Sequence, residues 1–149
     1  MTTHNTPAPS SSLSRVAASA APVFKTEASV RAGFPSPAED CAVSRLDISK
    51  LLVKHDQATF IMRVSGDSVR DFNIFDGDLI LVDRAVRPMH GMMVVAEVDG
   101  ENTVKKLFNS GGVVKLQAGN DDYPEIVLQG EQTLSIFGVV MWSITKHGA

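Results

Sequence analysis

A short polar segment, Ser65-Gly66-Asp67-Ser68, has the residue types that best suit nucleophilic chemistry in this chain. It follows a stretch of strand composition, and a serine on a sharp glycine-containing turn can expose its hydroxyl. Neighbouring backbone N–H groups can then point at one place, as an oxyanion hole requires. The same residue types also make ordinary turns, so the segment alone leaves both interpretations open.

A serine nucleophile needs a base, and histidine is the usual one. The chain has four histidines. His4 and His147 lie close to the two ends of the chain, which leaves His55 and His90 as candidates for a triad. Neither lies in an obviously constrained setting, so both are more typical of surface residues.

Lysine is the other possible base, provided that burial lowers its pKa from about 10.4 towards neutrality. The doublet Lys105-Lys106 falls within a predicted strand, where successive side chains point to opposite faces. One of the two lysines must therefore face inward or line a cleft, unless this is an edge strand with charge on both faces. Periodicity slightly favours Lys106 as the inward residue, because the apolar Val104 and Phe108 share its face.

A mostly β body must position these residues. Asp47 can cap a short helix over residues 48–53, and residues 59–64 have strand composition. Six further strands are bounded by turn signals rich in Gly, Asp, Asn and Pro. They are predicted over residues 78–83, 92–98, 103–108, 113–117, 125–129 and 133–144. This pattern predicts a mostly β fold, a bent antiparallel β domain with one short helix.

The charge and composition of the 149 residues divide the chain into two parts. Residues 1–31 carry three basic side chains and one acidic one, and 19 of them are Ala, Ser, Thr or Pro. Such a segment buries too little apolar surface to offset its ordering entropy, so we expect a flexible arm. The remaining residues carry 11 basic and 16 acidic side chains and suffice for one domain. Pro35 and Pro37 indicate a hinge between the two parts.

Several classes of protein are disfavoured. No apolar run approaches the roughly 18 to 20 residues that span a bilayer, so we expect no membrane segment. Serines and Arg15 interrupt any secretory signal, although the Ser-rich start also fits an organelle transit peptide. The single Cys41 excludes an internal disulfide and indicates a reducing compartment, so we expect a cytoplasmic protein.

The sequence also gives little support for a metal, a cofactor or direct DNA binding. The carboxylates of Asp76, Asp78 and Asp83 resemble a metal cluster, but no His or Cys completes a ligand set. A phosphate-binding glycine loop and a dinucleotide fingerprint are both missing from the sequence. The acidic body argues against broad electrostatic affinity for DNA. We therefore expect no cofactor, no metal and no sequence-specific contact with DNA.

Five segments, in the right order and with compatible spacing, resemble the LexA/UmuD family of self-cleaving Ser-Lys peptidases. The resemblance spans about residues 23–149. The segments are Ala32-Gly33-Phe34-Pro35-Ser36-Pro37-Ala38, Ser65-Gly66-Asp67-Ser68 with Asp71, Asp76-Gly77-Asp78-Leu79-Ile80-Leu81-Val82-Asp83, Asp99-Gly100-Glu101 with Thr103-Val104-Lys105-Lys106-Leu107, and Phe137-Gly138-Val139-Val140.

The resemblance implies a role for particular residues. Ser68 would be the nucleophile and Lys105 the general base, in place of the Lys106 that periodicity favours. The cleaved bond would join Ala32 to Gly33. The backbone N–H groups of Ser68 and Asp67 would hold the oxyanion.

Three positions stand apart from these roles. Ser65, the other serine of the motif, is not expected to be the nucleophile. The chain has Val69 where family members usually have methionine, and Arg70 has no role that the resemblance explains.

The family resemblance also implies partners and a biological setting. It implies a homodimer whose cleavage is stimulated by a RecA filament on single-stranded DNA, with residues 1–32 as the cleavable arm and 33–149 as the peptidase domain. The product would be a subunit of a UmuC-like Y-family DNA polymerase in SOS mutagenesis.

Other functions remain open beside this one. The alternative is an inactive family member that only binds a polymerase or RecA. A LexA-type repressor is disfavoured, because the 32 residues before the cleavage site are too few for a helix-turn-helix domain of about 60 to 70 residues. A signal peptidase would need a membrane anchor.

Overall fold

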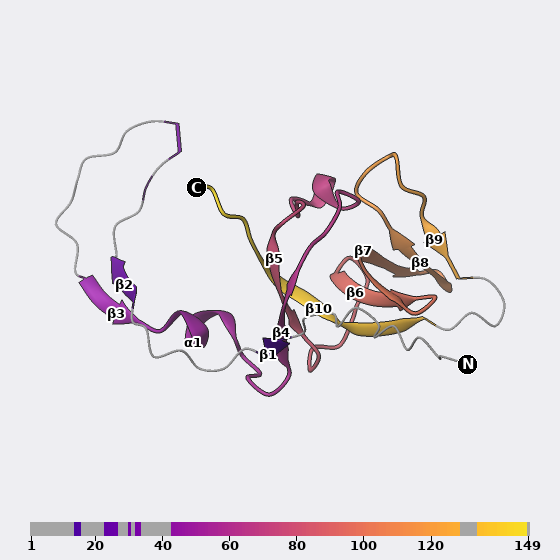
Figure 1. Cartoon of the computed structure of the whole chain (residues 1–149). Coiled ribbons are helices and arrows are strands. Elements are labelled where there is room, and N and C mark those ends of the chain that lie inside the picture. The colour runs from indigo at the N-terminus through magenta and orange to yellow at the C-terminus, as the bar shows by residue number, and fades with distance from the viewer. Residues whose placement is uncertain are drawn as a thin grey trace, which may run out of the picture.

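One antiparallel β-sheet dominates the protein (Figure 1). The computed structural model describes residues 14–15, 23–26, 30, 32–33, 43–128 and 134–148. The strand order of the main sheet is β1-β4-β5-β10-β6-β7-β8-β9. Its strands are β1 (Ser14–Arg15), β4 (Thr59–Arg63), β5 (Leu79–Asp83), β6 (Met93–Val98), β7 (Glu101–Ser110), β8 (Val113–Gln117), β9 (Ile126–Val127) and β10 (Ser135–Ile144). The prediction of a mostly β, antiparallel fold is confirmed.

The single α-helix of the described residues begins where the sequence indicates. Helix α1 (Ile48–Leu52) follows Asp47, whose carboxylate accepts a hydrogen bond from the backbone N–H of Ser49 at 2.9 Å. This bond satisfies one of the N–H groups that the first turn of a helix leaves unpaired. A 3₁₀ helix, η1 (Arg70–Phe72), follows the Ser65–Ser68 segment. In the described part of the chain, no helix is long and apolar enough to cross a membrane.

Two short strands lie within residues 1–31, and the sequence did not predict them. Strand β1 pairs with β4, with Ser14 opposite Ile61. Strand β2 (Val23–Thr26) pairs with β3 (Val43–Leu46) in a separate two-stranded sheet. The proline-containing segment that was predicted to be a hinge lies outside the described residues.

Strand β10 joins the two halves of the main sheet. Its first half pairs with β6 and its second half with β5, and the register shifts once in each pairing. Gly138 lies at the crossing, where an added Cβ would come within 2.8 Å of Val82 Cγ1 and 3.0 Å of the Asp83 carbonyl oxygen. Only a residue without a side chain permits this close approach, which lets the sheet bend around β10.

The bent sheet buries apolar residues on both of its faces. On β6, the consecutive residues Val94, Val95 and Ala96 are all buried, although successive side chains point to opposite faces. The buried residues form two clusters, one on each face. The first contains Val64, Val69, Ile74, Ile80, Val82 and Val95, and the second contains Val94, Ala96, Leu107, Leu116 and Val139.

Candidate active site

The polar segment that carries Ser68 leaves the sheet at the end of β4 through a tight turn. The N–H of Val64 donates to the backbone carbonyl oxygen of Asp78 at 2.8 Å. This bond continues the pairing of β4 with β5 for one more residue. Gly66 then takes φ +92, a conformation that favours glycine, and its N–H donates to the Asp76 carboxylate at 2.7 Å. These contacts fix the point at which the chain turns towards Ser68.

Ser68 and Lys105 form a direct pair. Lys105 Nζ donates a hydrogen bond to Ser68 Oγ at 2.7 Å. Lys105 lies in the middle of β7 and is only 6% exposed. Burial lowers the pKa of the Lys105 ammonium below its ordinary value. A neutral amine at this distance can accept the hydroxyl proton of a serine, which is the chemistry of a nucleophile and its base.

The preference of strand periodicity for Lys106 is wrong. Lys105 is the buried lysine, and Lys106 is half-buried with its Nζ 4.9 Å from the centre of the Phe72 ring. Apolar residues cover both faces of β7: Leu107 belongs to one core cluster and Val104 packs against the other. The polarity of neighbours on one face therefore could not indicate which lysine lies inside.

The backbone next to Ser68 presents free donors. Among the described residues, the N–H groups of Asp67 and Ser68 have no hydrogen-bond partner. Their carbonyl oxygens are engaged, because Asp67 O accepts from Asn120 Nδ2 at 3.0 Å and Ser68 O accepts from the N–H of Gly119 at 2.7 Å. The arrangement leaves two donors beside the Ser68 hydroxyl that could stabilise an oxyanion.

Residues of the loop between β8 and β9 also belong to this site, although the sequence did not predict them. Asn120 contacts the Asp67 carbonyl, and Tyr123 Oη donates to the Asp67 carboxylate at 2.9 Å. This hydrogen bond raises the pKa of the Tyr123 hydroxyl, which therefore stays protonated further into the alkaline range. In the sequence, Gly119-Asn120 looked only like a turn signal, because nothing local indicates that it packs against a segment more than 50 residues away.

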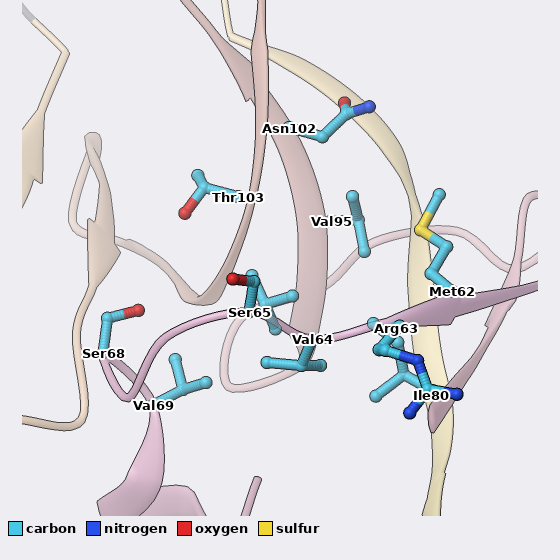
Figure 2. Close-up of a pocket in the computed structure, with 11 residues that line it drawn as sticks. Met62, Arg63, Val64, Ser65, Ser68, Val69, Ile80, Val95, Asn102 and Thr103 are labelled. Carbon is cyan, nitrogen blue, oxygen red and sulfur yellow. The ribbon is translucent and has the colours of Figure 1, made fainter. Parts of the chain in front are cut away.

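Two cavities meet at Ser65 and Ser68. One, of about 190 Å³, has apolar walls that include Met62, Val69 and Val104. Figure 2 shows the segment from Met62 to Val69 along one side of this cavity, with Asn102 and Thr103 of β7 across from it. The second, of about 440 Å³, is lined by Lys105, Tyr123, Asp99 and Glu101 among others. Ser68 therefore lies between a smaller cavity and a larger one whose lining includes charged side chains.

Comparisons with known proteins agree with this geometry. Residues 22–141 match the family described as Peptidase S24-like. The chain belongs to the LexA/UmuD family of S24-like peptidases. Protein SamA of Salmonella typhimurium is 41% identical over 128 residues, which cover 86% of this chain and 87% of SamA. Protein ImpA of Escherichia coli is 43% identical over 110 residues, 74% of each chain.

A LexA repressor is a more distant relative. The repressor of Shewanella woodyi is 37% identical over 120 residues, which cover 80% of this chain but 58% of the repressor. The likeness to SamA and ImpA makes this S24-like peptidase a UmuD-like SOS mutagenesis protein of the serine peptidase type.

The bond that the family resemblance marks for cleavage lies outside both cavities of this S24-like peptidase. Ala32 and Gly33 are exposed, and neither is among the residues that line the two cavities. Gly33 has φ +103, so the chain is not extended at this point. The structure thus presents the Ser68–Lys105 pair with this bond undocked.

The two histidine candidates lie in other contacts. His55 Nδ1 is 2.6 Å from the buried Asp83 carboxylate. His90 Nδ1 accepts a hydrogen bond from the N–H of Asn109, and its ring packs against Phe108. His147 is exposed, and His4 lies outside the described residues. The described geometry joins Ser68 to a lysine and to neither of these histidines.

The three acidic residues that resembled a metal cluster hold turns instead. Asp76 accepts from Gly66, Asp78 accepts from the N–H of Phe75, and Asp83 accepts from the N–H of Ala85. Within the described residues, no group of three or more His, Cys, Asp or Glu side chains could hold a metal ion.

Val69 and Arg70, the unusual residues after Ser68, have different environments. Val69 is 1% exposed and belongs to the first core cluster, so the shorter side chain is fully packed. Arg70 is exposed and lies 3.8 Å from the Asp71 carboxylate. No contact of Arg70 with Ser68 or Lys105 explains its presence.

Proposed function

We propose that this chain cleaves itself between Ala32 and Gly33, with Ser68 as the nucleophile and Lys105 as the general base. The observation that carries the proposal is the 2.7 Å contact between Lys105 Nζ and Ser68 Oγ, made by a lysine that is 6% exposed. Burial favours the neutral amine, and only the neutral amine can accept a proton.

The reaction is an acyl transfer in two stages. Lys105 takes the hydroxyl proton of Ser68 as Oγ bonds to the carbonyl carbon of Ala32, and the carbonyl electron pair moves to oxygen. The N–H groups of Asp67 and Ser68 donate to that oxyanion. When the C–N bond breaks, the Lys105 ammonium returns the proton to the Gly33 amine. Water then hydrolyses the ester, with Lys105 again as base.

The substrate segment suits a narrow cleft. Ala32 and Gly33 have almost no side chains, so their peptide bond can approach Ser68 closely. In an extended chain, Val30 and Ala32 point to the same side, which would place Val30 in the cavity lined by Met62 and Val69. Val30 is 96% exposed in the undocked structure, so docking would also bury this side chain.

Rate control lies in how often the arm docks. Because the arm and the site share a chain, local concentration replaces affinity for a separate substrate. A RecA filament on single-stranded DNA would act by favouring the docked arrangement, as a shift in population. The processed chain would then serve as a subunit of a UmuC-like Y-family translesion polymerase. We propose that it acts in the cytoplasm, where both of these partners would act.

The proposed homodimer has a suitable surface on β10. After Val139, β10 pairs only with β5 among the described residues, so its other edge is unpaired. Met141, Trp142 and Ile144 on this half of the strand are each more than 40% exposed. A second copy could pair along this edge and cover these side chains.

Replacing Trp142 with glutamate should therefore weaken the dimer, because the new charge would be buried against apolar side chains. We expect the dimer dissociation constant to rise at least about tenfold, measured by sedimentation velocity. Met89→Glu, an equally polar change at an exposed methionine of the β5–β6 loop, is the matched control and should leave the constant unchanged. Equal dissociation constants for Trp142→Glu and the unmodified chain would exclude this surface.

Cleavage should accelerate with rising pH. Below the pKa of Lys105 the rate constant should rise about tenfold per pH unit, because the neutral fraction does so, and it should level off above that pKa. Since burial lowers this pKa, the plateau should begin below the ordinary value of lysine. Intact-mass spectrometry after incubation at a series of pH values measures the rate and identifies the bond.

The expected products are fragments of 32 and 117 residues. A chain that stays intact at every pH and with active RecA filaments, yet binds a polymerase, would support the alternative of an inactive binding module. Cleavage at another bond would show that Ala32–Gly33 is not the substrate.

A further inference from the structure

We propose that Asn120 is a positioning residue for the oxyanion site. Its side-chain amide orients the Asp67–Ser68 peptide group, whose N–H donates to the oxyanion. The inference rests on the proposed function, in which the N–H of Ser68 donates to the oxyanion. Asn120 itself would touch no reacting atom. It acts through the orientation of a backbone donor.

Asn120 is a buried amide with both ends engaged. Asn120 is 3% exposed and lies in the loop between β8 and β9. Its Nδ2 donates to the Asp67 carbonyl at 3.0 Å, and its Oδ1 accepts from the N–H of Asp122 at 3.0 Å. Because a backbone N–H occupies the oxygen end, the NH₂ end must face Asp67. The amide therefore has one orientation that satisfies both of its contacts.

The hydrogen bond from Asn120 to the Asp67 carbonyl determines where the N–H of Ser68 points. A trans peptide group is planar, and its C=O and N–H point in opposite directions. The described residues contain no cis peptide bond. Fixing the Asp67 carbonyl towards Asn120 therefore turns the N–H of Ser68 away from the β8–β9 loop. The N–H of Arg70 also donates to this carbonyl, at a longer 3.3 Å, from within the same turn.

The β8–β9 loop also holds the next peptide group, between Ser68 and Val69, through a backbone hydrogen bond. The N–H of Gly119 donates to the Ser68 carbonyl at 2.7 Å, and the Gly119 carbonyl accepts from the N–H of Asp71 at 2.8 Å. An added Cβ on Gly119 would lie 2.7 Å from the Phe72 ring, so the loop packs directly on η1. Figure 1 shows the β8–β9 loop rising beside this 3₁₀ helix. The loop thus fixes the backbone conformation on both sides of Ser68.

Tyr123 makes a different kind of contact. Its hydroxyl donates to the carboxylate of Asp67, so it restrains a side chain and not the peptide group. Asn120 is therefore the side chain whose loss should act on the oxyanion donor itself. Its loss should leave the Lys105–Ser68 contact, and with it the pH at which Lys105 titrates, unaffected.

The first test measures self-cleavage of the full chain against pH for Asn120→Ala and Asn120→Asp. We expect a plateau rate roughly 10- to 100-fold lower, because misplacing an oxyanion donor costs transition-state stabilisation. The pH at half-plateau should not change. Asn120→Asp keeps the volume and the contact with Asp122 but places a carboxylate oxygen against the Asp67 carbonyl, so it should be impaired in the same way.

Glu125→Gln is the matched control from the same connection. Its carboxylate is exposed and accepts hydrogen bonds from Lys115 Nζ and Gln117 Nε2, not from the Asp67–Ser68 peptide. This variant should cleave within about twofold of the unmodified chain. Asn120 variants that cleave at the unmodified rate would overturn the positioning role while leaving self-cleavage intact. A shift in the half-plateau pH would assign the effect to Lys105 instead.

The second test needs neither cleavage nor a variant. Hydrogen exchange of the Asn120 side-chain NH₂, followed by NMR in the unmodified chain, should be much slower than that of an exposed amide, because Nδ2 is buried and donates to Asp67. Exchange as fast as in a free asparagine would overturn the inference. An unmodified chain that never cleaves but protects this amide would retain the Asn120 contact and reject the proposed function.

Discussion

Replacing Ser68 with alanine should stop cleavage of the Ala32–Gly33 bond, with a rate constant lowered roughly 10⁴-fold or more. The change removes the Oγ atom that lies 2.7 Å from Lys105 Nζ and would attack the carbonyl carbon. Ser68 is not part of the apolar clusters, so the fold should persist. Intact-mass spectrometry at alkaline pH measures the loss, and the thermal midpoint checks the fold.

Ser65→Ala is the informative comparison, because both serines belong to one motif and line the same two cavities. Lys105 Nζ contacts the hydroxyl of Ser68, so the Ser65 variant should still cleave. Loss of cleavage in Ser65→Ala with retention in Ser68→Ala would exchange their roles and contradict the proposed mechanism.

Replacing Lys105 with methionine should lower the cleavage rate constant roughly 10²- to 10⁴-fold, the range that a general base contributes. Methionine fills most of the same volume without an amine, so the packing between β6 and β7 should survive. The substitution also removes a buried charge site, and the thermal midpoint should therefore not fall. The residual rate should lose its steep dependence on pH, because no group with the lowered pKa of Lys105 remains.

Lys106→Met is the matched control on the adjacent position of β7. It removes the same charge and the contact with the Phe72 ring, but no contact with Ser68. Cleavage by this variant should stay within a few-fold of the unmodified rate. A larger loss in Lys106→Met than in Lys105→Met would restore the assignment that strand periodicity favoured.

Local sequence signals were sufficient for most of the regular structure. Asp47 marks the start of the short helix because its side chain can accept from the first turn, and the structure shows that bond. Strands between glycine-containing turns were predicted within a few residues of β5, β6 and β8. In each case the information lies within a few residues of the element, so no knowledge of the rest of the chain is needed.

The environment of the two lysines required the whole fold. Alternation along β7 correctly separates Lys105 from Lys106, but it identifies the inner face only when one face is solvated. Both faces of β7 are covered here, and Lys105 is buried because the Ser68 segment lies across it. The resemblance to self-cleaving peptidases selected Lys105 where the pattern of apolar neighbours could not.

Asn120 and the short strand β1 illustrate a second limit. Asn120 bonds to Asp67, and Ser14 lies opposite Ile61, so each contact joins residues roughly 50 apart in the chain. A turn signal such as Gly119-Asn120 looks the same whether it faces water or a catalytic segment. The polar composition around Ser14 likewise does not indicate the strand with which it pairs.

The pairing of β1 with β4 and of β2 with β3 gives the proposed cut a mechanical effect. Both β1 and β2 precede Ala32, whereas β3 and β4 follow it. Cleavage would leave these two strands attached to the body by non-covalent contacts alone, and their departure would uncover the backbone edges of β3 and β4. Breaking one covalent bond would then leave unpaired two strand edges that are hydrogen-bonded in the precursor. The processed chain would therefore differ from its precursor in surface as well as in length.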